Sequence, residues 1–153
     1  MKTPIPLLCA LMILGGCQST PHPKISDLAM NASPGNVKRI NLFDRTKGAG
    51  SPNQSKEFAT VEILGYEEDV VFVRLSSTTT SKTKDILITY KADFDCKQSL
   101  YRPTEGATTF KVNGPDGART EAPLKFNGAW SAFDRGDELV EKAHPLICYS
   151  AKP

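Results

Sequence analysis

Cysteine is the residue type in this chain whose spacing could do chemistry. The 153 residues include 4 cysteines, at positions 9, 17, 96 and 148, and 2 histidines, at positions 22 and 144. A thiol can bind a metal, attack a substrate, form a disulfide or be modified covalently. A metal site would need further Cys or His ligands near each sulfur, and only His144 is a candidate. Covalent modification and disulfide formation are therefore the reactions that the sequence favours.

The first sixteen residues are typical of an export signal. Lys2 is followed by an apolar run at 5–14, interrupted by Pro6, and then by Gly15 and Gly16. This charged, apolar, small order is that of a secretory signal peptide. The run is shorter than the roughly 20 apolar residues that cross a bilayer. We expect residues 1–16 to be removed.

The stretch Leu14-Gly15-Gly16-Cys17 resembles the lipobox of bacterial lipoproteins. The resemblance implies that Cys17 is acylated on its sulfur and becomes the first residue after cleavage. Such proteins carry three acyl chains, and burial of about 0.8 kcal/mol per methylene makes the anchor effectively permanent. Gln18 resembles the second residue of lipoproteins sorted to the outer membrane. The alternative, a buried cysteine ending a short core helix, lacks any amphipathic pattern around it.

Residues 17–36 read as a flexible tether that lifts a folded body off the membrane. They contain few large apolar side chains and end in Ser33-Pro34-Gly35-Asn36. His22 lies between two prolines in this segment, which favours a solvated linker residue. The predicted body is a single domain over residues 37–153.

Cys96 and Cys148 remain as an even pair once Cys9 leaves with the signal peptide and Cys17 is acylated. An exported protein meets an oxidising compartment, so we expect these two cysteines to form a disulfide. In the chain-entropy model, closing the loop between positions 96 and 148 contributes roughly 4 kcal/mol.

The sequence of residues 37–153 predicts an α+β fold, with an antiparallel sheet of five to six strands and a C-terminal helix on one face. Segment 76–84, rich in Ser and Thr, is interpreted as a solvated loop between strands, with some strand character in its Thr run. The Pro-Asp-Gly at 115–117 predicts a hairpin. The clearest strand alternates so that one face carries Ile86, Ile88, Tyr90, Ala92, Phe94 and Cys96. The other expected strands are at 37–43, 58–64, 70–75, 108–112 and 118–122.

The expected helix has an apolar stripe at Leu139, Val140, Ala143, Leu146 and Ile147. Asp137 or Asp134 can cap its first turn. Pro145 lacks an N–H and clashes with the preceding turn, so we expect the helix to kink there or to end near Ala143. An unbroken helix would place Cys148 away from the stripe, and a break at Pro145 would turn it inward.

Neither an enzyme nor a nucleic-acid-binding protein is expected. The sequence has no phosphate-binding glycine loop, no Gly-x-Ser-x-Gly and no His-Glu-x-x-His, and we expect no cofactor and no catalytic residue. Carboxylate pairs such as Asp93 and Asp95 fall where solvation explains them, and His144 reads as a helix-end cation or surface residue. Without Lys2, basic side chains outnumber acidic ones by one, so no strong field attracts nucleic acid.

From Asp85 onward, the chain resembles the surface-adhesin protein E family of small bacterial lipoproteins. A strand ends in Cys96, a polar segment 97–102 and a hairpin follow, and then Trp130 precedes a capped helix that ends in Leu146-Ile147-Cys148-Tyr149. Arg135-Gly136-Asp137 stands where the family often has Pro-Gly-Ser, and Pro145 departs from its pattern. The resemblance implies a sheet with a helix disulfide-bonded across it, and binding of host extracellular matrix in the founding adhesin.

We expect a non-enzymatic outer-membrane lipoprotein whose domain binds a protein partner, with a surface adhesin as one form of that binding. The candidate binding surface is Trp130, Tyr101 and Arg102. Trp130, the single Trp, is expected to pack in the core beside the disulfide; exposure would instead mark it as a binding residue. Two alternatives are a periplasmic inhibitor or immunity lipoprotein, with loop 76–84 or 113–117 blocking an enzyme, and an accessory component of an envelope or secretion machine.

Overall fold

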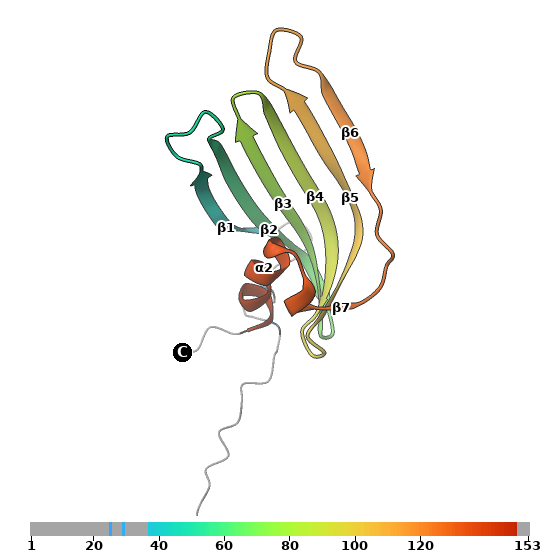
Figure 1. Ribbon diagram of the computed structural model, residues 1–153. Coiled ribbons are helices and arrows are strands. Elements are labelled where there is room, and N and C mark those ends of the chain that lie inside the picture. Colours follow the sequence, from blue (N-terminus) through green and yellow to red (C-terminus); the bar gives the residue numbers. More distant parts are fainter. Residues whose placement is uncertain (1–24, 26–28, 30–36, 150–153) are drawn as a thin grey trace, which may run out of the picture.

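The computed structural model describes Ile25, Ala29 and residues 37–149, and it shows one antiparallel sheet with a helix on one face (Figure 1). Six strands follow in chain order across the sheet, and a short seventh, β7, pairs with β5. This confirms the predicted α+β fold. The elements are β1 (Lys38–Lys47), β2 (Ser55–Glu67), β3 (Val70–Ser81), β4 (Lys84–Asp95), β5 (Leu100–Val112), β6 (Arg119–Leu124), β7 (Ser131–Ala132), a 3₁₀ helix (Phe133–Arg135) and α2 (Glu138–Cys148).

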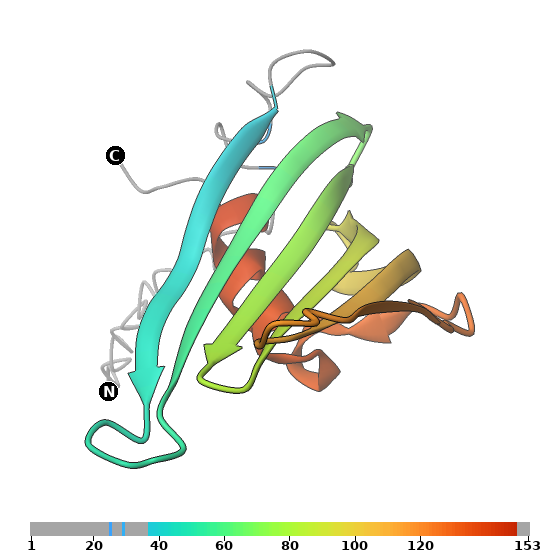
Figure 2. The same cartoon turned by 90° about the horizontal axis from the view of Figure 1, so that it is seen from above.

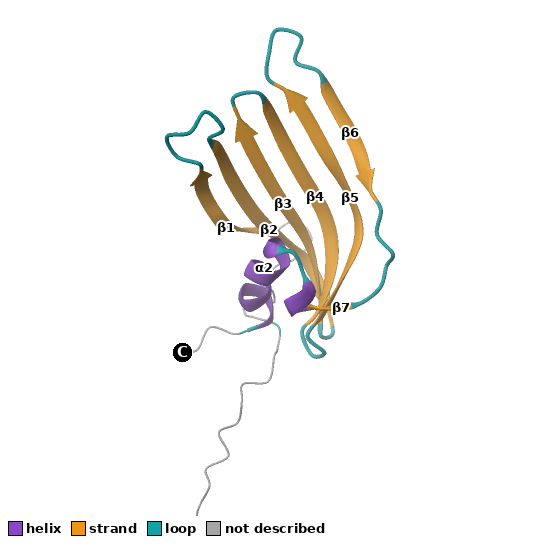
Figure 3. Ribbon diagram, in the orientation of Figure 1, coloured by secondary structure: helices purple, strands orange, loops and turns teal. Residues whose placement is uncertain are grey.

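Turns join β1 to β6, and each of these six strands pairs with its neighbours along the chain (Figure 3). The expected pairing of β2 with β3 is confirmed, with Val61 opposite Leu75. The prediction of a loop over 76–84 is wrong for residues 76–81, which continue β3, and the strand character expected of the Thr run is confirmed. Residues 76–80 pair on both sides, for example Thr78 with Phe58 and with Leu87. β-branched threonines fit a sheet that has a neighbour on each side, and only Lys82 and Thr83 form the turn.

Figure 2 shows α2 beside one face of the sheet, and the hydrophobic core lies between them. This helix-side face carries Val61, Leu75, Ala92 and Phe94, all at most 1% exposed. The opposite, outer face carries Glu62, Arg74 and Lys91, which the register places side by side. The predicted alternation is confirmed for Tyr90, Ala92, Phe94 and Cys96, which are buried. Ile86 is half-buried, and Asp95, expected on the polar face, is buried.

The helix covers only one end of the helix-side face (Figure 1). Its 11 residues span about 16 Å at 1.5 Å per residue, whereas the 12 residues of β4 extend over about 40 Å. Ile88 shares the face of Phe94 but is 36% exposed, because it lies beyond the part that α2 covers. The sheet is therefore open at the end of the β3–β4 turn.

Asp137 is the N-cap of α2, and its Oδ1 accepts a hydrogen bond from the Val140 N–H at 3.0 Å. The helix does not end at Ala143 but continues through Pro145 to Cys148. Pro145 is exposed, so the bond it cannot donate is lost on the solvent side of the helix. Cys148 is fully buried within the helix, and no break is needed to turn it inward.

The hydrophobic core also includes two residues that the sequence placed in the tether. Ile25 is 8% exposed and Ala29 is 0% exposed, and both belong to the same cluster as Val61 and Ile147. At these two positions the prediction of a solvated tether is not met. The other residues of the predicted tether, the signal peptide and Cys17 lie outside the described residues. Within the described part, no helix is long and apolar enough to cross a membrane.

Candidate binding surfaces

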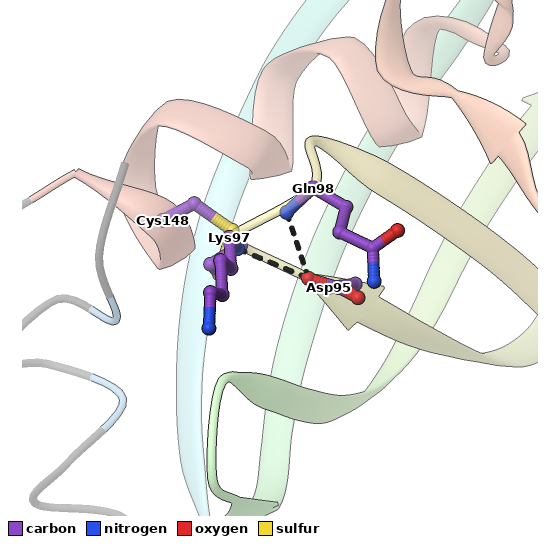
Figure 4. Close-up of a disulfide and its surroundings, with 5 residues drawn as sticks. Asp95, Lys97, Gln98 and Cys148 are labelled. Atoms are coloured by element: carbon purple, nitrogen blue, oxygen red, sulfur yellow. Dashed lines mark hydrogen bonds between the residues drawn. A yellow bond between two sulfur atoms is a disulfide. The ribbon is translucent and has the colours of Figure 1, made fainter. Parts of the chain in front are cut away.

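The disulfide joins Cys96, at the end of β4, to Cys148, the last residue of α2, with their Cα atoms 5.0 Å apart. Both residues are 0% exposed. Figure 4 shows the turn beside the disulfide, where Asp95 Oδ1 accepts hydrogen bonds from the backbone N–H groups of Lys97 and Gln98 at 3.0 and 2.8 Å. Asp95 is thus held by these bonds rather than by solvation. The buried disulfide fixes the helix on the sheet.

Trp130 lies against Arg102 on the outer face, near the β5 side of the sheet. The Arg102 guanidinium carbon is 4.6 Å from the Trp130 ring centroid, and Arg102 Nε donates to Asp93 Oδ2 at 3.1 Å. The prediction that Trp130 packs in the core is wrong, because Trp130 is 39% exposed. β7 pairs Ser131 with Tyr101, so residue 130 falls opposite Arg102, and strand alternation directs both outward.

Tyr101 lies on the other face, so the candidate surface of Trp130, Tyr101 and Arg102 is divided. The Tyr101 ring stacks on Phe133 at 6.2 Å and meets Phe94 edge-on at 6.4 Å between centroids. Burial, and next the charge of Asp137, raise the pKa of Tyr101. Tyr101 thus belongs to the packing under α2, while Trp130 and Arg102 form an exposed pair.

A row of charged residues crosses the outer face, which the sequence analysis missed. Arg39, Glu62, Arg74, Lys91 and Glu105 are successive register partners on β1 to β5. Arg39 forms an ion pair with Glu62 Oε1, and Arg74 binds Glu62 Oε2 at 2.8 Å. These hydrogen bonds, that of Arg39 above all, lower the pKa of Glu62. Only the strand register brings these residues together.

Tyr90 connects the sheet to the start of α2. Its hydroxyl donates to Asp137 Oδ2 at 2.6 Å, while Asp137 Oδ1 caps the helix. Burial, and then the Asp137 charge, raise the pKa of Tyr90, so it stays a neutral donor. This hydrogen bond ties the N-cap of α2 to β4.

His144 is neither the helix-end cation nor the surface residue that the sequence favoured. Its ring stacks on Phe133 with 3.7 Å between centroids, and Tyr149 meets it edge-on at 5.1 Å. Burial lowers the pKa of His144, which favours the neutral ring, and Nε2 has no hydrogen-bond partner among the described residues. No group of three or more His, Cys, Asp and Glu in the described part could hold a metal ion.

Comparisons of the chain with models of known families, with curated proteins and with solved structures find no match. The resemblance to the surface-adhesin protein E family therefore stays a prediction. The lipidation of Cys17 also stays a prediction, because that residue lies outside the described ones.

Proposed function

We propose that this protein is a non-enzymatic outer-membrane lipoprotein whose disulfide-bonded domain binds a protein partner. The sequence up to Gln18 supports the export, anchoring and sorting steps. The domain supports a binding role through a rigid sheet with exposed side chains of the types that dominate protein interfaces. The resemblance to the protein E family favours a surface adhesin as the form that this binding takes.

The observation that carries the proposal is the exposed pair of Trp130 and Arg102. Trp and Arg are enriched among the residues that contribute most to protein–protein affinity. Arg102 is fixed between the Trp130 ring and Asp93, so little side-chain freedom is lost when a partner binds. The exposed part of the Trp130 ring is apolar surface that a bound partner would remove from water.

A matched pair of variants tests the proposed surface. Phe58 on β2 is 40% exposed, similar to Trp130 at 39%, and lies three strands away from β5 on the same face. We expect Trp130→Ala to reduce the recovery of cross-linked partner proteins from intact cells at least tenfold, and Phe58→Ala to leave it within twofold. Equal recovery with both variants would contradict a binding role for Trp130.

Two fractionation experiments test the location. Replacing Cys17 by Ser should move the protein from the membrane fraction to the soluble periplasmic fraction, and retention in the membrane would contradict the anchor. Protease treatment of intact cells should degrade a surface-exposed domain. Protection of the domain until the outer membrane is opened would rule out the adhesin form and leave a periplasmic binding role.

The inhibitor alternative has less support from the structure than from the sequence. One of its two expected protruding loops, 76–84, is mostly strand β3, which leaves the β5–β6 turn at 113–117. An accessory role in an envelope or secretion machine uses the same kind of partner binding. The cross-linked partner would distinguish these alternatives.

A further inference from the structure

The outer face of the sheet is hollowed beside its row of charged residues. The register places Thr60, Ser76 and Thr89 side by side on β2, β3 and β4, next to that row. These short side chains form the floor of a depression of about 310 Å³. A second depression of about 450 Å³ is also lined by Arg74 and Thr89, and it reaches Ala107 on β5. The two depressions together form a groove that crosses the strands.

Thr60 provides an unused polar group on the floor of this groove. The residue is 6% exposed, and it lines the first depression. Its hydroxyl makes no side-chain hydrogen bond within the described part of the chain and is not sealed from the depression. The hydroxyl oxygens of Ser76 and Thr89 differ, because they bond to each other at 3.3 Å. A hydroxyl both donates and accepts, so Thr60 can bond to a ligand without breaking a bond between side chains.

Arg74 provides a partly used cation beside the same floor. Its Nη1 donates to Glu62 Oε2 at 2.8 Å, and its Nε and Nη2 make no hydrogen bond with any described residue. The same edge of Arg39 binds Glu62 Oε1, so two guanidinium groups share one carboxylate. Lys91 and Glu105 pair with each other, which leaves one net positive charge near β1 to β3. The open edge of Arg74 can hold an external carboxylate through two parallel hydrogen bonds.

The wall of the groove opposite the charged row is apolar. Phe58 on β2 is 40% exposed and Leu87 on β4 is 37% exposed, and both lie opposite Thr78 of β3. All three residues line the first depression. Asp44 lies next to Phe58 on β1 but does not line it, so this wall presents no carboxylate to the groove. A ligand between the two walls meets a cation on one side and apolar surface on the other.

We propose that this groove binds an acidic saccharide, a chain of sugar rings that carry carboxylate groups. The carboxylate of one ring binds the open edge of Arg74, a ring hydroxyl bonds to Thr60, and the C–H face of the ring contacts Phe58 and Leu87. An acidic peptide fits less well, because its backbone N–H and C=O groups would also need partners. β2, β3 and β4 each pair with a strand on both sides, so their own backbone groups are already used.

The probe is a tetrasaccharide of galacturonic acid, titrated into the isotopically labelled Cys17→Ser chain and followed by NMR chemical shifts. We expect saturable shifts of the Thr60, Ser76 and Thr89 amides, with a Kd below about 5 mM. The methyl ester of the same tetrasaccharide keeps the rings and lacks the charges, so its Kd should be at least tenfold higher. A peptide of four Glu residues carries the charges without the rings, and its Kd should also be at least tenfold higher.

Variants of two buried threonines then locate the site. Thr60→Val keeps the shape of the side chain and removes the hydroxyl, so it should raise the Kd of the tetrasaccharide at least threefold. Thr108 on β5 is 9% exposed and pairs with Ile88 on the helix-side face, so Thr108→Val is the matched control and should change the Kd less than twofold.

A second pair of variants tests the charge. Arg74→Gln removes the open guanidinium edge and should raise the Kd at least tenfold, while Arg39 still pairs with Glu62. Lys111 is an exposed cation on β5 that lines neither depression, so Lys111→Gln should change the Kd less than twofold.

Three results would overturn the inference: a Kd above about 5 mM, a methyl ester or Glu peptide that binds as tightly as the acid, or equal effects of Thr60→Val and Thr108→Val. Trp130 lines neither depression, so Trp130→Ala should leave saccharide binding unchanged. Phe58→Ala should weaken saccharide binding at least threefold. These effects are the reverse of those expected for the recovery of protein partners, so a failure of one surface is distinguished from a failure of the other.

Discussion

Replacing both Cys96 and Cys148 by Ala should remove a large part of the stability of the domain. The two residues are 52 positions apart, and the chain-entropy model gives a contribution of about 4 kcal/mol for a loop of that length. A domain of this size has a free energy of unfolding of about 5–15 kcal/mol. The double variant should thus fold, but with a much smaller margin.

Urea denaturation of the Cys17→Ser chain, followed by Trp130 fluorescence, measures this loss. With a urea dependence of roughly 1.5 kcal/mol per M, the midpoint should fall by about 2–3 M. The Cys17→Ser chain with its disulfide reduced should unfold near the midpoint of the double Ala variant. A loss of less than about 1 kcal/mol in the free energy of unfolding, or a reduced chain as stable as the oxidised one, would show that the disulfide does not fix α2 on the sheet.

Three further changes test the packing of the sheet and its helix, each by the same urea midpoint. A Cβ at Gly106 would lie 2.5 Å from Tyr90 Cβ, so Gly106→Ala should lower the free energy of unfolding by about 1–3 kcal/mol. The control Gly114→Ala places its Cβ with no atom within 4 Å and should lower it by less than about 0.5 kcal/mol. Similar losses in the two variants would contradict the β4–β5 register. Tyr90→Phe removes the bond to Asp137 and should cost about 2 kcal/mol; no loss would show that the bond does not hold the helix cap. The pKa of Glu62 is lowered in the folded state, so its ionised carboxylate contributes to the free energy of unfolding above the unfolded pKa of about 4.3, and this contribution is lost as pH falls through the folded pKa. Between pH 6 and pH 3, the free energy of unfolding of the Glu62→Gln variant should therefore fall less than that of the parent chain. Parallel pH curves for the two proteins would contradict this ion pair.

The sequence predicted the fold where one local pattern determined it. Alternation over residues 86–96 placed Cys96 among the core residues, and the count of exported cysteines paired it with Cys148; the structure has both features. Local chemistry offered Asp137 or Asp134 as the helix cap, and the structure has Asp137 in that role. These features depend on periodicity and on side-chain type, which the sequence contains.

Other features depend on contacts between distant segments. Threonines at 78–80 form strand because β2 and β4 lie on both sides, and an isolated Ser and Thr run does not reveal those neighbours. Trp130 is exposed because the two residues of β7 set its phase, and a two-residue strand has too little alternation to be predicted. The charged row requires five strands in register. Burial of Ile25 shows that the core extends before residue 37.

Intact-protein mass spectrometry tests whether Cys17 is acylated while Cys96 and Cys148 form a disulfide. For protein purified from the membrane fraction, we expect a chain that begins at Cys17, carries the mass of its acyl chains, and has two hydrogens fewer than a chain with Cys96 and Cys148 reduced. A chain that retains residues 1–16, or an unmodified Cys17, would contradict the anchor, and two free thiols would contradict the disulfide.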